Sequence, residues 1–419
     1  MTAFDSYYAQ SFRLTPLAAD PIPPAPMPAR ATSFKDAFID PVYGTRIYHA
    51  TSGSEAKGNR VRHEYSRRQA FNADNSRFLA LSGDGRLYLY DAINFKQIRE
   101  LKNVPGECEA IWHPTDPNKL YHTSMFGGMV WWVYDIATDT QEVVFDFTGK
   151  TPWPQARSYW TKSEGTMSAD GRYLALMATT YDNTTKENKI YGLLMLDLQQ
   201  KKIIGTLDAA KFPKPFAFPD HISTSPSGKY AVPSWLHGEG GTRAYTQDFS
   251  TSKLLLDNSQ HSDLAFGPNR EDMYVYMDYT SGYVAARNLD TLEAFNITPL
   301  YQGNHESWGG HISGQAFDKP GWVVISASGD SAAYGSITPS PDLRPQYRKV
   351  FLAELKPNGR LLNVAHIRHK VATGEKDYFG ETQASASRDL SRIIYASNFG
   401  GTSPDDYIIG LPSWWDKSK

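Results

Sequence analysis

Seven polar residues stand at the same position relative to a recurring turn in this chain. Each precedes an Asp-, Ser- or Gly-containing turn by roughly six residues, and the set is Arg68, Glu109, Glu164, His221, His261, His311 and Gln383. Three of them in succession are histidines. A neutral imidazole near a positive charge can accept a proton near neutral pH, so this set predicts a site capable of acid–base chemistry.

Other residues near these positions add chemistry. His63 precedes the first turn, Arg243 and Tyr245 lie near the fourth, and Trp308 precedes the sixth. Glu381 and Gln383 alternate on an extended segment and can both face His311 of the neighbouring repeat. Imidazole, carboxylate and amide oxygen together suit Mn²⁺ or Ca²⁺ better than structural Zn²⁺. A hydrogen-bonded contact between repeats explains the same three residues equally well.

The elements that must position these residues are short strands. A run of small or alternating residues, a turn and a β-rich run recur at a spacing of about 50 residues, and the copies start at Gln69, Ala110, Gly165, Ile222, Leu264, Ile312 and Ala384. A second strand pair follows most copies. Four strands per repeat are typical of propeller blades, so we expect an all-β, seven-bladed β-propeller with the polar set around one mouth of its channel. A pair of β-sandwiches is the alternative, and the even spacing disfavours it.

The two ends of the chain complete this prediction. The last copy lacks one strand, and residues 40–49 can supply it, closing the ring and covering an exposed strand edge. Residues 1–33 are rich in Pro and Ala, which predicts an extended N-terminal arm, with the propeller at residues 34–419. Neither prediction says anything about oligomeric state.

Composition excludes several classes of function. The 419 residues carry a formal charge of −2, which disfavours nucleic-acid and anionic-membrane partners. Cys108 is the only cysteine, so neither an intrachain disulfide nor a cysteine zinc site is expected. No phosphate loop, Gly-x-Ser-x-Gly or His-Glu-x-x-His motif occurs. Without a signal-like N-terminus or an apolar span, we expect a soluble, cytoplasmic protein; a trimmed signal peptide would instead indicate the periplasm or secretion.

Five segments together resemble oligogalacturonate lyase and related propeller-fold polysaccharide lyases. They begin at His63, Arg243, His261, Gly310 and Gln383, and their order and approximate separations agree with that family. The resemblance implies cleavage of a uronate glycan, with His261 as the base, Arg243 as the cation that neutralises the uronate, His311 as a Mn²⁺ ligand and His221 near the substrate. The family has a Gln-x-x-His-x-His ligand set where this chain has Tyr378 to Gln383, so specificity for galacturonate is not inherited.

The hypothesis from the sequence is therefore β-elimination on an acidic oligosaccharide or polysaccharide. Abstraction of the C5 proton of a uronate requires that its carboxylate be neutralised. The assigned catalytic residues are His261, Arg243 and His221, the substrate contacts His63, Arg68, Tyr245, Trp308 and Glu164, and the ligands of a Mn²⁺ or Ca²⁺ ion His311, Glu381 and Gln383. Two alternatives remain. One is a glycoside hydrolase using two of Glu109, Glu164 and Glu306, and the other is a non-catalytic binding propeller.

Overall fold

Antiparallel strands build almost the whole chain. The structure is a computed structural model that describes residues 1–301, 308–330, 344–369 and 378–417. The helices within these ranges are single 3₁₀ turns, η1 (Asp5–Tyr7), η2 (Gly53–Glu55), η3 (Ala209–Lys211) and η4 (Tyr378–Gly380). None of the described helices has the length and apolar character needed to cross a bilayer. The predicted all-β class is confirmed.

Local sequence explains the strands. In β5 (Arg86–Asp91), Leu87 and Leu89 are buried while Arg86 is exposed, the alternation expected of a half-buried strand. An Asp84-Gly85 turn precedes it, and Gly85 has a φ of 78°, which glycine adopts without steric cost. Such hairpins recur along the chain.

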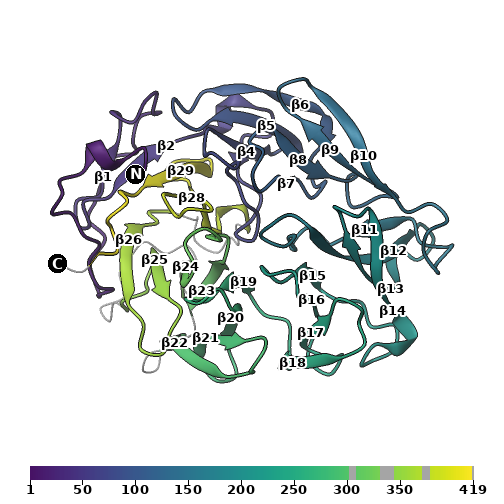
Figure 1. Cartoon of the computed structure of the whole chain (residues 1–419). Helices are drawn as coiled ribbons and strands as arrows, with labels where there is room; N and C mark the ends of the chain where they lie inside the picture. The colour runs from purple at the N-terminus through teal and green to yellow at the C-terminus, as the bar shows by residue number, and fades with distance from the viewer. Residues whose placement is uncertain (302–307, 331–343, 370–377, 418–419) are drawn as a thin grey trace.

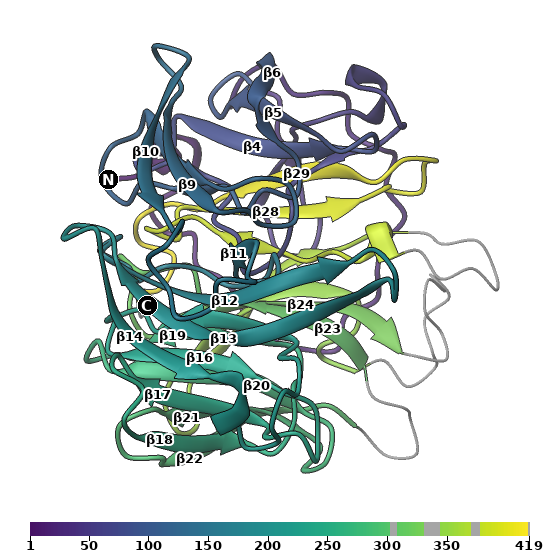
Figure 2. The ribbon, with the colours of Figure 1, turned by 90° about the vertical axis from the view of Figure 1, so that its right-hand side faces the viewer.

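Five sheets are four-stranded antiparallel meanders in chain order. They stand around a common centre (Figure 1), and Figure 2 views the same sheets after a quarter turn. Their strands are β7 (Ile111–Trp112), β8 (Lys119–His122), β9 (Val130–Asp135) and β10 (Thr140–Asp146); β11 (Ser158–Trp160), β12 (Tyr173–Asp182), β13 (Glu187–Asp197) and β14 (Lys202–Asp208); β15 (His221–Thr224), β16 (Tyr230–Ser234), β17 (Thr242–Thr246) and β18 (Ser252–Leu256); β19 (Ser262–Phe266), β20 (Asp272–Asp278), β21 (Tyr283–Asn288) and β22 (Ala294–Pro299); β23 (Trp308–Ser313), β24 (Trp322–Asp330), β25 (Lys349–Glu354) and β26 (Leu361–His366).

The remaining sheet has nine strands and combines the two ends of the chain. One half is β3 (Val61–Arg62), β4 (Arg77–Ser82), β5 and β6 (Gln97–Pro105). The other half is β27 (Ser385–Ala386), β28 (Arg392–Ser397) and β29 (Asp405–Gly410), extended by β2 (Arg46–His49) and β1 (Phe38–Ile39). A single parallel pair, Asp405 with Val61, joins the halves. The N-terminal strand β2 thus pairs with β29, with Arg46 opposite Gly410, as the sequence predicts for residues 40–49.

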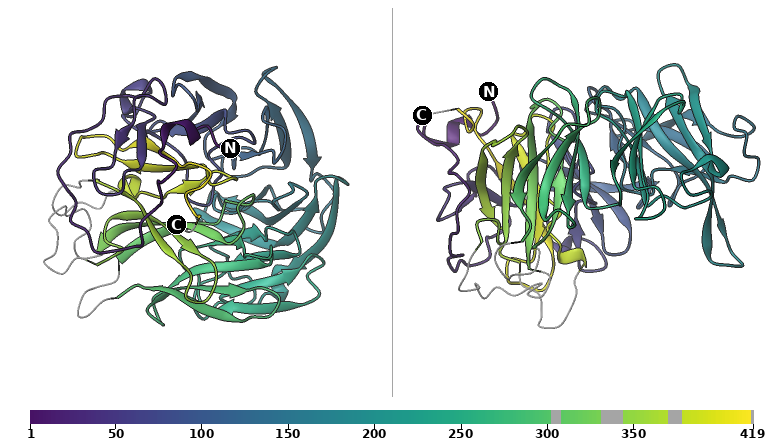
Figure 3. Two further views of the ribbon diagram at one scale, coloured as in Figure 1. Left: turned by 60° about the vertical axis from the view of Figure 1, so that its left-hand side comes forward. Right: turned by 90° about the horizontal axis from the view of Figure 1, so that it is seen from below.

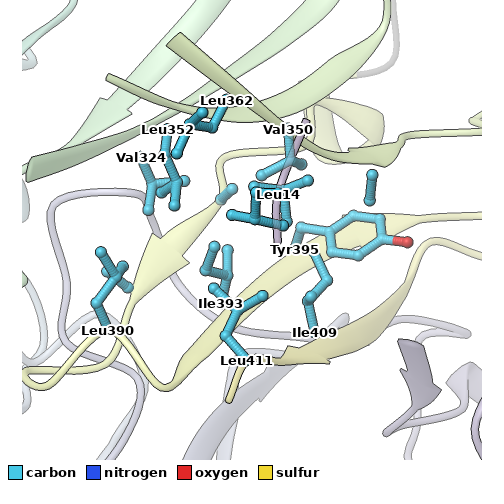
Figure 4. Close-up of a cluster of buried hydrophobic side chains, with 14 of the residues drawn as sticks. Leu14, Val324, Val350, Leu352, Leu362, Leu390, Ile393, Tyr395, Ile409 and Leu411 are labelled. Atoms are coloured by element: carbon cyan, nitrogen blue, oxygen red, sulfur yellow. The ribbon is translucent and has the colours of Figure 1, made fainter. Parts of the chain in front are cut away.

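The hydrophobic core is divided into clusters between consecutive strand units. One cluster lies between each four-strand unit and the next, from β4–β6 against β7–β9 through to β23–β26 against β28–β29. A further cluster joins β2, β28 and β29 to β4 and β5 through Tyr48, Ile394, Ile408 and Phe78. Figure 4 shows the cluster in which Val324 and Leu352 face Ile393 and Ile409. Hydrophobic side chains are therefore buried between each strand unit and the next.

Side chains from different sheets meet at the common centre, at the end where the inner strands finish. Ala169, Phe266 and Phe317 form a small buried cluster although they come from three sheets that are not all consecutive. Arg388, after β27, donates from Nη2 to the carbonyl of Ala169 at 3.1 Å and lies over the ring of Phe317. Contacts among these sheets require that the side chains meet near the common centre.

Residues 1–33 run over the outside of the β23–β26 sheet and the last strand unit (Figure 3). Leu17 donates its backbone N–H to the carbonyl of Leu361 at 2.8 Å. Phe4 is fully buried, with its ring 4.7 Å from Phe34. Asp5 accepts from the backbone N–H of Ser413 at 2.7 Å, so the two ends of the chain lie side by side. The division at residue 33 stays a prediction.

Candidate active site

The starts of the inner strands bring the predicted polar set to one face of the molecule. His221 is the first residue of β15, His311 lies in β23, and Glu109, His261 and Gln383 come just before β7, β19 and β27. Because inner strands of successive propeller-like units run in the same direction, their first residues meet at one mouth.

Arg67 is the central charge of this site. Its Nη1 lies 2.9 Å from Oε2 of Glu164 and 2.7 Å from Nε2 of His221, and its Nη2 is 3.4 Å from the carbonyl oxygen of Gln260. The side chain is only 4% exposed. Burial alone would lower the pKa of Arg67, but Glu164 and further acidic groups nearby, Tyr65 and Asp263 among them, together outweigh it and the pKa is raised. The guanidinium therefore stays charged.

A tight turn presents Glu164 to Arg67. Lys162 and Ser163 have positive φ angles of 66° and 64°. The buried carboxylate of Glu109 holds the turn by accepting the N–H of Thr161 at 2.9 Å and that of Ser163 at 2.7 Å. At Gly165, an added Cβ would lie 1.8 Å from the carbonyl oxygen of Ile222, so only glycine permits this approach to β15. Glu109 is thus a positioning residue.

His221 is held as a neutral imidazole. Nε2 faces an Arg67 N–H and must accept, which places the proton on Nδ1, 3.4 Å from Oδ2 of Asp220. Burial, and then the charge of Arg67, lower the pKa of His221. The hydrogen bond to His221 holds the pKa of Asp220 well below its usual range. Asp220 therefore remains a carboxylate beside the ring.

His261 and His311 form a stacked pair beside this cluster. Their ring centroids are 4.5 Å apart at an angle of 21°. Nδ1 of His261 lies 2.7 Å from the carbonyl oxygen of Gly310 and therefore donates to it, which leaves the lone pair on Nε2 in the neutral ring. Burial, followed by the charges of His261 and Arg67, lowers the pKa of His311 well below its usual value. Tyr65 meets the His311 ring edge-on at 5.3 Å.

Arg62 and His63 tie the site to the last strand unit. Arg62 donates from Nη2 to Oε1 of Gln383 at 2.5 Å. Both nitrogens of the His63 ring are engaged, Nδ1 with Asp406 at 2.6 Å and Nε2 with the carbonyl oxygen of Gln383 at 2.6 Å. His63 is 1% exposed. It therefore supports the site and leaves no ring nitrogen for a substrate.

A cavity of about 130 Å³, open to solvent, adjoins these residues. Glu64, Tyr65, Glu164 and Gln383 are in its wall, as is Glu107. Burial raises the pKa of Glu64 to about 7, opposed by Arg68 and reinforced by Glu107 and Glu109. Burial likewise raises the pKa of the Tyr65 hydroxyl. The cavity wall thus holds a carboxyl group and a phenol that both retain protons near neutrality.

Comparison with known proteins identifies the fold. No protein-family model matches the chain, and no curated protein matches it. Among solved structures, an oligogalacturonate lyase in complex with manganese superimposes with a TM-score of 0.59 at 17% identity, and the match covers 91% of this chain and 97% of that one. An oligogalacturonate lyase from Vibrio parahaemolyticus also gives 0.59, at 12% identity and the same coverage. The chain shares its fold with oligogalacturonate lyase. The resemblance predicted from the sequence is confirmed.

Three residues expected at the site lie away from it: Arg243, which the resemblance to oligogalacturonate lyase implied, and Tyr245 and Trp308, which were predicted as substrate contacts. Arg243, in the third strand of its sheet, donates from Nε to its own Gly240 carbonyl at 3.0 Å, and its Nη1 lies 3.5 Å from Ser252. Tyr245 is buried in the core between β11–β14 and β15–β18. Trp308 is completely buried and donates to the carbonyl oxygen of Pro299. A ring with no exposed face cannot stack on a sugar, so the sugar contact expected of Trp308 is wrong.

The other predicted residues are brought together, in part with other roles. Glu164 and His221 meet at Arg67, and His261 and His311 stack beside them. Glu381 approaches His311, with Oε2 3.4 Å from Nε2. Arg68 lies 3.8 Å from Glu109 and 3.4 Å from Thr161 Oγ1, which makes it a support for the Glu164 turn. The expected Glu306 lies outside the described residues.

Candidate metal ligands fall into two groups. The predicted group, His311, Glu381 and Gln383, is incomplete because the Gln383 amide oxygen is bound by Arg62. A second group was not predicted: Glu164, Asp220 and His221 offer ligand atoms within 4.8 Å of one another. Arg67 contacts two of these three side chains. Neither group fits a cation in the arrangement described, so no step below depends on one.

Sequence reasoning missed Arg67, Asp220 and Glu64. The pair Arg67-Arg68 was visible, but the repeat alignment selected Arg68. Both arginines lie in a turn, in which the Arg68 N–H donates to the Tyr65 carbonyl oxygen at 3.1 Å, so strand alternation does not determine which of them points into the site. Asp220 precedes a selected histidine, and a carboxylate next to a histidine could have marked it.

Proposed function

We propose that this chain is a lyase that cleaves a uronate-containing glycan by β-elimination, on a closed ring of seven blades. The seven hydrophobic clusters between successive strand units, together with the β2–β29 pairing, support seven blades and closure by the N-terminal strand. The observation that carries the function is a buried, charged guanidinium, Arg67, adjoining His221 and close to the stacked His261. Such a combination suits removal of a proton next to a carboxylate.

The chemistry assigns one role to each group. Nε2 of His261 takes the C5 proton, because Gly310 fixes the other ring nitrogen as a donor. Arg67 supplies the positive charge that stabilises the enolate-like intermediate. The C4–O4 bond then breaks, a C4=C5 double bond forms, and the leaving oxygen takes a proton from Tyr65, which lines the cavity. No water is consumed. The substrate class is an acidic oligosaccharide or polysaccharide.

One observation favours a second candidate, a glycoside hydrolase. Glu64 and Glu164 line the same cavity, and the raised pKa of Glu64 contrasts with a Glu164 that is paired with Arg67. Two carboxyl groups that face one cavity, one of them with a raised pKa, are the pattern of an acid–nucleophile or acid–base pair. Glu109, the partner considered from the sequence, is fully buried on backbone N–H groups. It is unsuited to that role.

One assay separates the candidates. The full-length protein is incubated with a panel of uronate polysaccharides and oligosaccharides, and both near-ultraviolet absorbance and reducing ends are followed. A lyase creates an unsaturated uronate that absorbs, whereas a hydrolase creates reducing ends without that chromophore. We expect absorbance. Reducing ends alone would favour the hydrolase, and neither signal on any substrate would contradict both.

Two variants test the roles on the substrate so found. We expect His261→Asn to lower kcat by a factor of about 10²–10⁴, the range for loss of a general base. Arg243→Ala is the matched control, because its guanidinium contacts only its own sheet among the described residues, and it should retain activity. Full activity of His261→Asn would contradict the assignment of the base.

A further inference from the structure

We propose that guanidinium groups, Arg67 above all, supply the entire positive charge of this site, and that the chain is a lyase without a catalytic divalent cation. The inference rests on the proposed function. It departs from the similar lyase structure that contains manganese. Each of the two groups of candidate metal ligands supports this inference separately.

The first group of candidate metal ligands is Glu164, Asp220 and His221. Arg67 Nη1 lies between the Glu164 carboxylate and His221 Nε2, at 2.9 and 2.7 Å. A cation bound to His221 through Nδ1 would require the proton on Nε2. That N–H would then point at an Arg67 N–H at 2.7 Å, and neither group could accept. A cation bound through Nε2 would occupy the place of the guanidinium itself.

The second group of candidate metal ligands is His311, Glu381 and Gln383. Arg62 is buried and holds the Gln383 amide oxygen at 2.5 Å, while its Nη1 holds the carbonyl oxygens of Phe379 and Glu381 at 2.5 and 3.0 Å. The Arg62 guanidinium thus occupies the amide oxygen that a cation would need, and its charge disfavours a doubly charged ion at that place because like charges repel.

A guanidinium fits the task that a metal performs in such a reaction. Its planar fork matches a carboxylate in a bidentate manner and it keeps its charge at every working pH. Arg67 is already desolvated, so its charge acts in a medium of low dielectric constant. Glu164, whose side chain is 32% exposed, is the carboxylate that occupies this cation in the unliganded chain. The carboxylate of the sugar would compete with it for Arg67.

The first test measures metal binding directly. The purified full chain is equilibrated with Mn²⁺ and separately with Ca²⁺, desalted, and its metal content determined by elemental analysis. We expect well under one ion per chain and no rise in melting temperature with either ion, since a ligand that binds only the folded state would raise it. About one ion per chain that is lost in His221→Ala or His311→Ala would overturn the inference. This outcome is decisive even for an inactive preparation.

The second test uses the active enzyme. Activity should survive exhaustive chelation, Arg67→Lys should lower kcat/KM by a factor of about 10²–10³, and guanidinium ions should partly restore Arg67→Ala. Arg243→Lys is the control. Activity that disappears on chelation and returns with Mn²⁺ would overturn the inference while leaving the lyase proposal intact. Absence of unsaturated product from the untreated enzyme on every substrate would instead contradict the lyase proposal, leaving the metal measurement to decide the inference.

Discussion

At the scale of single residues, burial and neighbouring charge decide which groups of the site titrate near neutral pH. Glu64 is half-buried in the cavity wall, beside Glu107 and Glu109 and with only Arg68 in opposition. Its pKa is about 7 in the folded chain, whereas an ordinary glutamate has a pKa of 4.5. The folded state therefore holds a proton that the unfolded state releases between these two pH values.

This difference predicts a stabilising substitution. Because the folded state binds more protons between pH 4.5 and 7, Glu64 makes the chain less stable as pH rises through that window, by up to about 3 kcal/mol. We expect Glu64→Gln to raise the free energy of unfolding at pH 8 and to leave it nearly unchanged at pH 4. Urea unfolding at the two pH values measures the difference. Glu142→Gln, at an exposed position, should show no such pH dependence.

The sequence predicted the location of the site more accurately than the side chains that form it. The phased turns identified the starts of the inner strands, and Glu164, His221, His261 and His311 do converge there. Arg67 was missed because β3, the strand before it, has only two residues, Val61–Arg62. So short a strand does not show which of the following residues points into the site. Arg243 was placed by resemblance and Trp308 as an aromatic that could stack on a sugar, and neither argument determines the direction of a side chain.

At the scale of elements, the N-terminal arm contributes a strand edge and a buried aromatic ring. Phe4 is fully buried against Phe34 and Tyr48, with a guanidinium, that of Arg392, over its ring. Gly410 of β29 has no room for a side chain because its Cβ would lie 2.4 Å from the Phe4 ring. The arm is therefore fitted closely to the last strand unit.

Removing this ring tests the arm. We expect Phe4→Ala to lower the free energy of unfolding by about 3–5 kcal/mol, the usual cost of deleting a buried phenylalanine. Lyase activity at low temperature should persist, because Phe4 touches none of the site residues. Denaturant unfolding measures the loss. Met1 is fully exposed, so Met1→Ala is the control, and an equal loss in both variants would contradict the assignment.

The order of elements followed from sequence because each turn carries its own local signal. The missing outer strand was found from an unmatched strand edge, which is an argument about hydrogen bonds that every propeller must satisfy. The first and last residues of each strand were harder to predict from the sequence. β7 and β27 have only two residues each, and in and next to β27 the N–H groups of Ala386 and Ala384 donate to serine hydroxyls of β23 and β24.

At the scale of the whole molecule, buried histidines make the fold sensitive to acid. Burial lowers the pKa of His122, His221, His311 and His366, the last to about 4. His366 has no exposed side-chain surface and lies 3.0 Å from the Tyr43 hydroxyl. The unfolded chain binds protons at these groups below pH 6.5, and the folded chain resists them. The stability that these four histidines contribute is therefore complete above that pH and declines below it, opposite in sign to the contribution of Glu64.

His366 gives the clearest test of this decline. The difference between a pKa of about 4 in the folded chain and 6.5 for an ordinary histidine corresponds to about 3 kcal/mol lost between those pH values. We expect His366→Gln to be less stable at pH 8 but to lose less stability from pH 7 to pH 4.5 than the unaltered chain. Urea unfolding across pH measures the two slopes. His237→Gln should keep the original slope, because its side chain is 76% exposed; equal slopes in all three proteins would contradict the prediction.

The contact between Ala169, Phe266 and Phe317, with the Arg388 guanidinium over the Phe317 ring, narrows the centre of the molecule at the end away from Arg67 and His261. Under the proposed lyase function, an acidic glycan is therefore expected to approach, and its fragments to leave, on the side where Arg67 lies.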